Sequence, residues 1–292
     1  MRPLMTGGGR GSRGGGRLKA RSLVFDLYGD YLRYSGGQVR LRGLVTLLDC
    51  FGIPDATTRV AAARLRKEGW LAADREGRET VYSLTESAWQ MLDEGRDRIF
   101  QRAAGPWDGQ WHMVIYQVPE TERALRERLR RRLAWFGFGP LSPSVWLSPH
   151  NRGRQVIDDF ADYPAAQLDS FRSRSAGNGA DRDIAARAWD LAALERDYRD
   201  LLARYSPRLA GYRSGALDER AALVERMRLI NDYRHFPFRD PDLPAELLPD
   251  GWPGRQAHEV FLQAHGLLRA PAERAVAELA GVELAGVETR AH

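Results

Sequence analysis

A helix predicted over residues 55–67 carries the first side chains in this sequence whose types and spacing indicate a chemistry. Four small or apolar residues recur at helical spacing and define its buried stripe: Thr58, Ala61, Ala62 and Leu65. Five residues face outward: Thr57, Arg59, Ala63, Arg64 and Lys67. No acid lies between residues 56 and 67, and small and basic side chains on an outward face suit base edges in the major groove of DNA.

A hairpin is predicted directly after this helix. Residues 71–73 and 80–84 form its two strands, with the turn between them. Arg75 and Arg78 lie at the tip, within reach of phosphates or of the minor groove of the same duplex. The alternative is a helical bundle with a solvated basic face, but a hairpin placed directly after Trp70 favours DNA binding.

Two further groups of residues suit an anionic or aromatic ligand. Arg126 and Arg130 share one face of a helix predicted over residues 120–136, and arginines clamp phosphates bidentately. The alternative is a solvated face paired with the glutamates of that helix. Three residues before a proline-rich stretch mix aromatic and basic groups: Tyr233, Arg234 and His235. They would line a pocket for an aromatic group, or pack the proline-rich stretch on its domain.

Motifs of enzymes occur only in fragments. Gly9, Gly11 and Gly14 spell GxGxxG, but no strand can precede them, so they form no dinucleotide site. His258 and Glu259 begin an HExxH motif, but a leucine replaces its second histidine. The single cysteine excludes an internal disulfide and a zinc site built on paired thiolates. We therefore predict no catalytic residue, no metal site and no cofactor, and hence no enzyme.

The composition is that of a globular protein of two or three domains. Of the 292 residues, 43% are hydrophobic and 28% are charged, and no run of about 18 apolar residues indicates a membrane span. The net charge of +5 arises from a Gly/Arg-rich segment, because residues 1–21 hold six basic residues and no acid. We expect residues 1–20 to be a disordered tail and the protein to be cytoplasmic.

The elements that position these residues indicate an α+β, multidomain protein. Residues 21–104 read as a winged helix-turn-helix: helix 22–34, short strand 39–41, helices 44–51 and 55–67, the hairpin, and a helix from Thr85 to about residue 104. Residues 105–180 read as a central ferredoxin-like α/β domain: strand 111–118, helix 120–136 and strands 145–147 and 167–174. Residues 181–292 read as a C-terminal helical domain: helices 184–205, 217–235 and 256–268, with an extended proline-rich coil from residue 237 to 253.

Four segments of this sequence resemble the PaaX family, the phenylacetic acid catabolon repressors. The segments are RVAAARLRKEGWL, WDGQWHMVIYQVPETERALRERLRRRLAWFGFGPLSPSVWLSP, AWDLAALERDYRDLLARY and INDYRHFPFRDPDLPAELLPDGWPG. The resemblance implies a winged helix, a central domain with the fold of the CRISPR-associated spacer-acquisition endonuclease, and a helical domain. It implies a homodimeric repressor of an aromatic-catabolism operon, released from double-stranded operator DNA by phenylacetyl-CoA or a related aryl-CoA. The phosphates of such an effector would bind Arg126 and Arg130, and its aryl group the residues around Tyr233.

Two alternatives remain beside this interpretation. A paralogous regulator would answer to a different acyl-CoA. A protein of a different class would be a metal-dependent nuclease of the central fold, which needs an aspartate near the end of the first central strand. That position reads Tyr116, Gln117 and Val118, and glutamine is a poor magnesium ligand.

Overall fold

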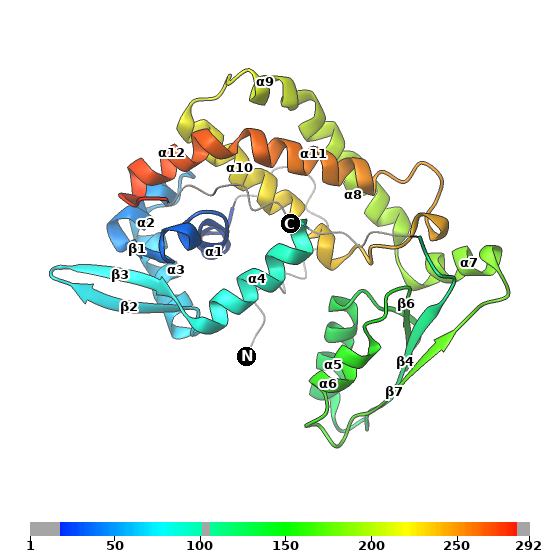
Figure 1. Ribbon diagram of the computed structural model, residues 1–292. Coiled ribbons are helices and arrows are strands. Elements are labelled where there is room, and N and C mark those ends of the chain that lie inside the picture. Colours follow the sequence, from blue (N-terminus) through cyan, green and yellow to red (C-terminus); the bar gives the residue numbers. More distant parts are fainter. Residues whose placement is uncertain (1–17, 101–105, 285–292) are drawn as a thin grey trace. The chain divides into compact units, whose positions relative to one another are not determined.

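The computed structural model describes residues 18–100 and 106–284 (Figure 1). These residues divide into two compact units. The first, here called the N-terminal unit, holds residues 18–92, 217–231 and 268–284. The second, the central unit, holds the other described residues. The first seventeen residues of the expected tail, including the GxGxxG motif, lie outside the described residues.

The N-terminal unit combines six helical segments with a small sheet. Its elements are α1 (Ala20–Asp30), a 3₁₀ turn (Leu32–Ser35), β1 (Gln38–Arg40), α2 (Leu41–Asp49), α3 (Asp55–Lys67), β2 (Leu71–Glu76), β3 (Glu79–Leu84), the start of α4 (Glu86–Phe100), most of α10 (Glu219–Tyr233) and α12 (Arg269–Ala280). The antiparallel sheet has the order β1-β3-β2, and the hairpin β2–β3 turns at Gly77, whose φ of 62° suits glycine. The predicted order of helices, short strand and hairpin is therefore present. The predicted helix over residues 22–34 ends earlier, at Asp30, and continues as the 3₁₀ turn.

Two helices from the far end of the chain complete the core of this unit. Helix α12 packs against α2, where a Cβ atom on Gly43 would lie 2.6 Å from the carbonyl oxygen of Ala280 (Figure 1). Helix α10 is tied to α1 by a buried ion pair, in which Arg226 Nη1 lies 2.7 Å from Asp30 Oδ2. The Arg226 guanidinium also lies over the ring of Tyr31, 4.9 Å from its centroid.

The central unit contains a four-stranded antiparallel sheet with the order β5-β6-β4-β7. Its elements follow in the order β4 (Trp111–Gln117), α5 (Arg123–Trp135), β5 (Gly139–Ser142), β6 (Val145–Ser148), α6 (Gly153–Asp159) and β7 (Gln167–Ser173). Strands β4, β6 and β7 match the predicted ones, whereas β5 and α6 were not predicted. Helix α6 is only seven residues long and two of its residues are buried, so its sequence has little hydrophobic periodicity.

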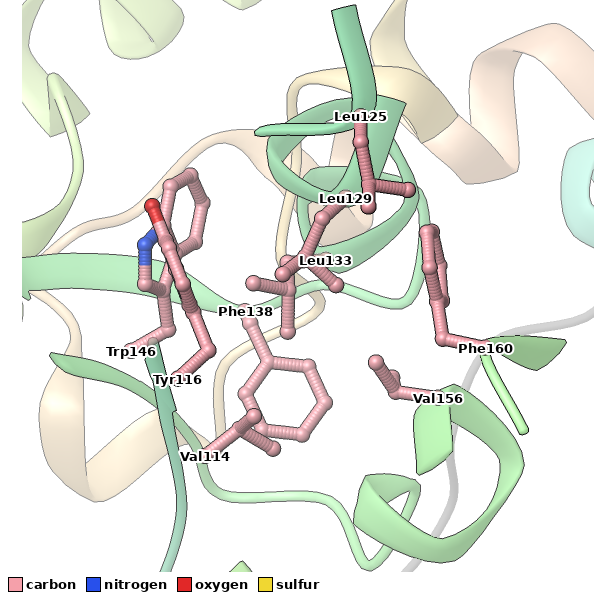
Figure 2. Packing of buried hydrophobic residues seen from close by; sticks show 9 residues of the cluster. All are labelled: Val114, Tyr116, Leu125, Leu129, Leu133, Phe138, Trp146, Val156 and Phe160. Atoms are coloured by element: carbon pink, nitrogen blue, oxygen red, sulfur yellow. The ribbon is translucent and has the colours of Figure 1, made fainter. Parts of the chain in front are cut away.

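One face of this sheet is covered by α5 and α6. Helix α5 buries Leu125, Leu129 and Leu133, as its spacing predicts (Figure 2). They pack with residues of the strands and of the segment around α6: Val114, Tyr116, Phe138, Trp146, Val156 and Phe160. The core therefore fixes which flanks of α5 remain open to ligands.

The other helices of the central unit are α7 (Asn178–Ala188), α8 (Leu191–Tyr205), α9 (Leu209–Arg213) and α11 (Gly254–Leu267). The single helix predicted over residues 184–205 is wrong, because the chain breaks at Trp189 and Asp190. Trp189 is extended, and the Asp190 side chain accepts a hydrogen bond from the backbone N–H of Ala193 at 3.0 Å, which starts α8. The predicted proline-rich coil contains two 3₁₀ turns, Phe236–Phe238 and Ala245–Leu247.

The contact between α2 and α12 predicts the effect of a single methyl group. Gly43→Ala should lower the free energy of unfolding by about 1–3 kcal/mol, because the new Cβ would clash with backbone atoms of Ala280, which cannot move away as a flexible side chain could. Gly266→Ala is the matched control, since a Cβ there meets nothing within 4 Å and alanine favours a helix. Denaturant unfolding of both variants is the measurement. Equal stability of Gly43→Ala and the original chain would contradict this packing.

Candidate functional site

The outward face of α3 is exposed, as the sequence predicted. Thr58, Ala61, Ala62 and Leu65 are buried, and α1 and α2 pack on that side. All seven residues predicted to contact DNA are exposed: Thr57, Arg59, Ala63, Arg64, Lys67, Arg75 and Arg78. The structure thus gathers five of them on one helix face and two on the hairpin that follows.

Two arginines of α3 are held by acids one turn away. Arg59 Nε donates to Asp55 Oδ1 at 2.5 Å, and this hydrogen bond raises the pKa of Arg59. Arg64 Nε donates to Glu68 Oε1 at 3.0 Å. Burial alone would raise the pKa of Glu68, but hydrogen bonds from Arg21 and Arg64 bring it below its usual range. Asp55 and Glu68 lie just outside the acid-free stretch of residues 56–67, so the absence of acids within that stretch did not predict these pairs.

A second feature of α3 was also missed. At 3.6 residues per turn, the residues directly opposite the buried stripe are Ala56, Val60, Ala63 and Lys67. Val60 is 68% exposed, the largest fraction among the exposed large hydrophobic residues of the described chain. The signal was present in the sequence, because the same spacing that predicts the buried stripe also places Val60 outside it.

The hairpin carries charges of both signs. Arg40 Nε lies 3.2 Å from Glu79 Oε2 and Arg40 Nη2 lies 3.4 Å from Glu76 Oε2. Among the described residues, no acid pairs with Arg75 or Arg78. These two guanidinium groups are therefore available to an anionic partner.

The five residues predicted to bind an effector do not line one cavity. Arg126 and Arg130 line a cavity of about 560 Å³ at the end of β4, here called the arginine cavity. Its other lining includes Tyr116, Gln117 and Ser144. Arg126 Nη2 donates to the carbonyl of Val118 at 3.3 Å, and Glu120 is the single acid in the lining. This cavity therefore has the charge that a phosphate requires.

Tyr233 lines a separate cavity of about 770 Å³, here called the tryptophan cavity. Trp135 and Phe136 at the end of α5 contribute aromatic surface to it. Its lining also holds five acids and two arginines, namely Glu94, Asp158, Asp159, Asp240, Asp242, Arg132 and Arg152. This excess of negative charge disfavours phosphates. Arg126 and Trp135 lie on opposite flanks of α5, nine residues apart, which explains why the two cavities are distinct.

Arg234 and His235 line neither cavity. His235 lies at the surface, and partial burial of its ring together with the neighbouring Arg234 lowers its pKa. Inside the tryptophan cavity, His150 Nε2 lies 2.8 Å from the carbonyl oxygen of Asp242. Asp242 has a φ of 54°, a conformation that costs a non-glycine residue free energy and that often occurs at binding sites.

The tryptophan cavity is lined by both helices that pass between the two units. Helix α4 leaves the N-terminal unit after Leu92, and Glu94 and Ile99 line the cavity. Helix α10 leaves it after Asn231, and Tyr233 lines the cavity two residues later. Tyr233 is fixed there, because its ring stacks on Phe261 at a centroid distance of 3.9 Å.

The described residues hold no group of three or more histidine, cysteine, aspartate or glutamate side chains that could bind a metal ion. At the end of β4, where a nuclease of this shape needs a carboxylate, the exposed side chain is Gln117. Within the described part of the chain, no helix is long and apolar enough to cross a membrane.

Comparisons with known proteins match three consecutive segments of the chain. Three family models match: PaaX-like protein over residues 19–88, PaaX protein central Cas2-like domain over residues 104–185, and PaaX-like protein C-terminal domain over residues 189–278. The transcriptional repressor PaaX of Escherichia coli (strain K12) is 29% identical over 258 residues, which cover 85% of this chain and 80% of that protein.

These similarities define a regulator of transcription rather than an enzyme. The chain belongs to the PaaX family. The uncharacterized protein Rv0674 from Mycobacterium tuberculosis has a similar structure, with a TM-score of 0.59 and 24% identity. The match covers 88% of this chain and 98% of that one, so the likeness of fold extends over nearly the whole molecule.

Proposed function

We propose that this protein is a repressor of a phenylacetate-type catabolic operon that binds its operator through α3 and the β2–β3 hairpin. The observation that carries the proposal is the outward face of α3, on which basic side chains are exposed beside the small residues Ala56 and Ala63. The chain is also related to a transcriptional repressor. A cytoplasmic location follows from this role.

We interpret the N-terminal elements as a winged helix-turn-helix with α3 as the recognition helix and the hairpin as the wing. We interpret the central sheet as ferredoxin-like, because a β-α-β-β-α-β chain order with strand order β5-β6-β4-β7 is typical of that fold. Thr57, Ala63 and Lys67 would face the groove, and Arg75 and Arg78 of the wing would contact phosphates.

Arg59→Ala and Arg64→Ala should each weaken binding to the selected operator by about 1–3 kcal/mol where the arginine contacts a base edge. The probe is a duplex that the full-length protein enriches from a random pool, compared with a scrambled duplex at the same salt concentration. Fluorescence anisotropy gives both dissociation constants.

Arg154→Ala is the matched control, because Arg154 also pairs with an acid one turn away, Asp158, but lies on α6. It should leave binding unchanged. Equal losses on the selected and scrambled duplexes would make Arg59 and Arg64 phosphate contacts. No loss on either duplex would remove α3 from the interface.

We further propose that an aryl-CoA, such as phenylacetyl-CoA, releases the repressor. Its acyl group would occupy the tryptophan cavity, where Trp135, Phe136 and Tyr233 offer aromatic surface. Its phosphates would bind Arg126 and Arg130 in the arginine cavity. Because α4 and α10 both line the tryptophan cavity and continue into the N-terminal unit, a ligand there would favour a conformation with lower affinity for the operator.

Trp135→Ala should weaken the binding of phenylacetyl-CoA by about tenfold and leave the binding of free CoA unchanged, since only the thioester carries the aryl group. Arg126→Ala should weaken both ligands alike, since both carry the phosphates. Titration calorimetry with full-length protein measures all four values, and Trp135→Phe is the control that keeps an aromatic ring. Thioester binding no tighter than that of free CoA would refute the aryl effector, and tighter binding of another acyl-CoA would favour the paralogous regulator.

The proposed repressor acts as a homodimer, because one recognition helix reads too few base pairs for selectivity in a genome. Sedimentation of the full-length chain should give a mass of twice 32.9 kDa. The selected operator should be an imperfect inverted repeat that binds two chains. A monomer at concentrations at which the operator is saturated would contradict this arrangement.

A further inference from the structure

The centre of the outward face of α3 is apolar rather than basic. Ala56, Val60 and Ala63 run along it, and the longer cations stand at its sides, with Arg59 on one flank and Arg64 on the other. A single exposed aliphatic residue on a protein surface needs no explanation. Here three apolar side chains share one stripe on a helix whose other exposed residues are polar, so the stripe requires a partner of its own.

Val60 is the residue that makes this stripe distinctive. It is 68% exposed, so it contributes little to the core of the N-terminal unit. A branched β-carbon also lowers helix propensity compared with the lysine, glutamine or glutamate usual at such a position. Neither folding nor local helix stability therefore accounts for a valine at this place.

The charges around the stripe indicate the chemistry of the partner. Arg59 and Arg64 flank it, Lys67 follows it along the helix, and Arg75 and Arg78 lie on the adjacent hairpin. No acid of the described ranges pairs with Arg75 or Arg78, so an apolar protein surface would give these two cations no counterion, whereas a duplex supplies phosphates on both sides of its groove. Among the four bases, thymine alone presents an apolar group in the major groove, its 5-methyl group.

We propose that Val60 recognises the 5-methyl group of a thymine in the operator, and that Ala56 and Ala63 leave room for the bases on either side of it. This inference rests on the proposed DNA binding and adds the base chemistry that α3 selects. The flanking arginines position the helix in the groove, and the contact between Val60 and the methyl group selects the base.

The test replaces single thymines by deoxyuridine, which removes only the 5-methyl group. The probes are duplexes that full-length protein enriches from a random pool, with each dT changed to dU in turn. At one or two positions per half-site, the change should weaken binding by the original chain about fourfold, the equivalent of the ~0.8 kcal/mol for burial of one methyl-sized group. Val60→Ala should bind the unmodified duplex about as weakly as the original chain binds the dU duplex. At those positions, the variant should not distinguish dT from dU.

Two controls separate this contact from a general loss of binding or of fold. Leu262→Ala removes another exposed aliphatic side chain, 39% exposed and outside the N-terminal unit, and it should retain the full dT-to-dU effect. Val60→Ala should unfold at the same temperature as the original chain or slightly above it, because an exposed side chain is removed and alanine favours a helix.

The outcomes distinguish this inference from the proposed function. Enrichment of a specific duplex, with the same dT-to-dU effect in Val60→Ala as in the original chain at every position, would overturn the methyl contact and leave DNA binding intact. Selected half-sites without any thymine would overturn it in the same way. Failure to enrich any duplex would overturn the DNA-binding proposal, and the methyl contact with it.

Discussion

The buried ion pair between Asp30 and Arg226 is the interaction on which the architecture of the N-terminal unit depends. The two residues are 196 positions apart, and Arg226 is only 2% exposed. Removing one partner of such a pair leaves an uncompensated buried charge, which typically costs 3–5 kcal/mol. The attachment of α10 to α1 is therefore specific. Together with the close approach of α12 to Gly43, it makes two C-terminal helices part of the unit that presents α3.

Helix α10 connects the core of the N-terminal unit with the tryptophan cavity. Helix α2 contacts both α12 and α3, so the helices that complete the core also support the helix with the exposed basic face. Helix α10 carries Arg226 in the N-terminal unit and, two turns later, Tyr233 in the tryptophan cavity. In the proposed release, a displacement of Tyr233 by the ligand would act along α10 on the ion pair.

The sequence predicts those parts of the structure that depend on neighbouring residues. The buried stripes of α3 and α5 follow from helical spacing, and β4 follows from alternation next to Pro119. The sequence does not indicate the break at Asp190, because the apolar spacing continues across it. Only the extended Trp189 and the capping side chain of Asp190 separate the two helices. The division into two interleaved units could not be predicted from the sequence, because no local pattern in residues 217–231 indicates that they pack on α1.

The candidate sites show the same limit. Exposure of the seven predicted DNA-contacting residues follows from one helix and one hairpin, so the sequence could predict it. The predicted effector residues are divided between cavities on two flanks of α5, and the end of α10 lines only one of them. No local pattern in the sequence indicates this division. Val60 also follows from helical spacing, but an apolar side chain on an outward face gives no signal of DNA binding by itself.

The acids at the two ends of α3 determine how a repressor of this kind would select its site. Phosphate attraction alone gives binding without sequence preference, and it competes over the whole genome. Arg59 pairs with Asp55 and Arg64 pairs with Glu68, each one helical turn away. In the free protein, these acids therefore neutralise part of the positive charge that would attract phosphates. Exposed ion pairs of this kind are weak, so a base edge of good geometry can take the place of the acid as the partner of the arginine. A phosphate contact of poor geometry would stabilise the complex less. In the proposed repressor, the pairs would therefore reduce binding to random DNA more than binding to a matched site, and the apolar stripe between them would add a methyl contact to the base-edge contacts of the arginines.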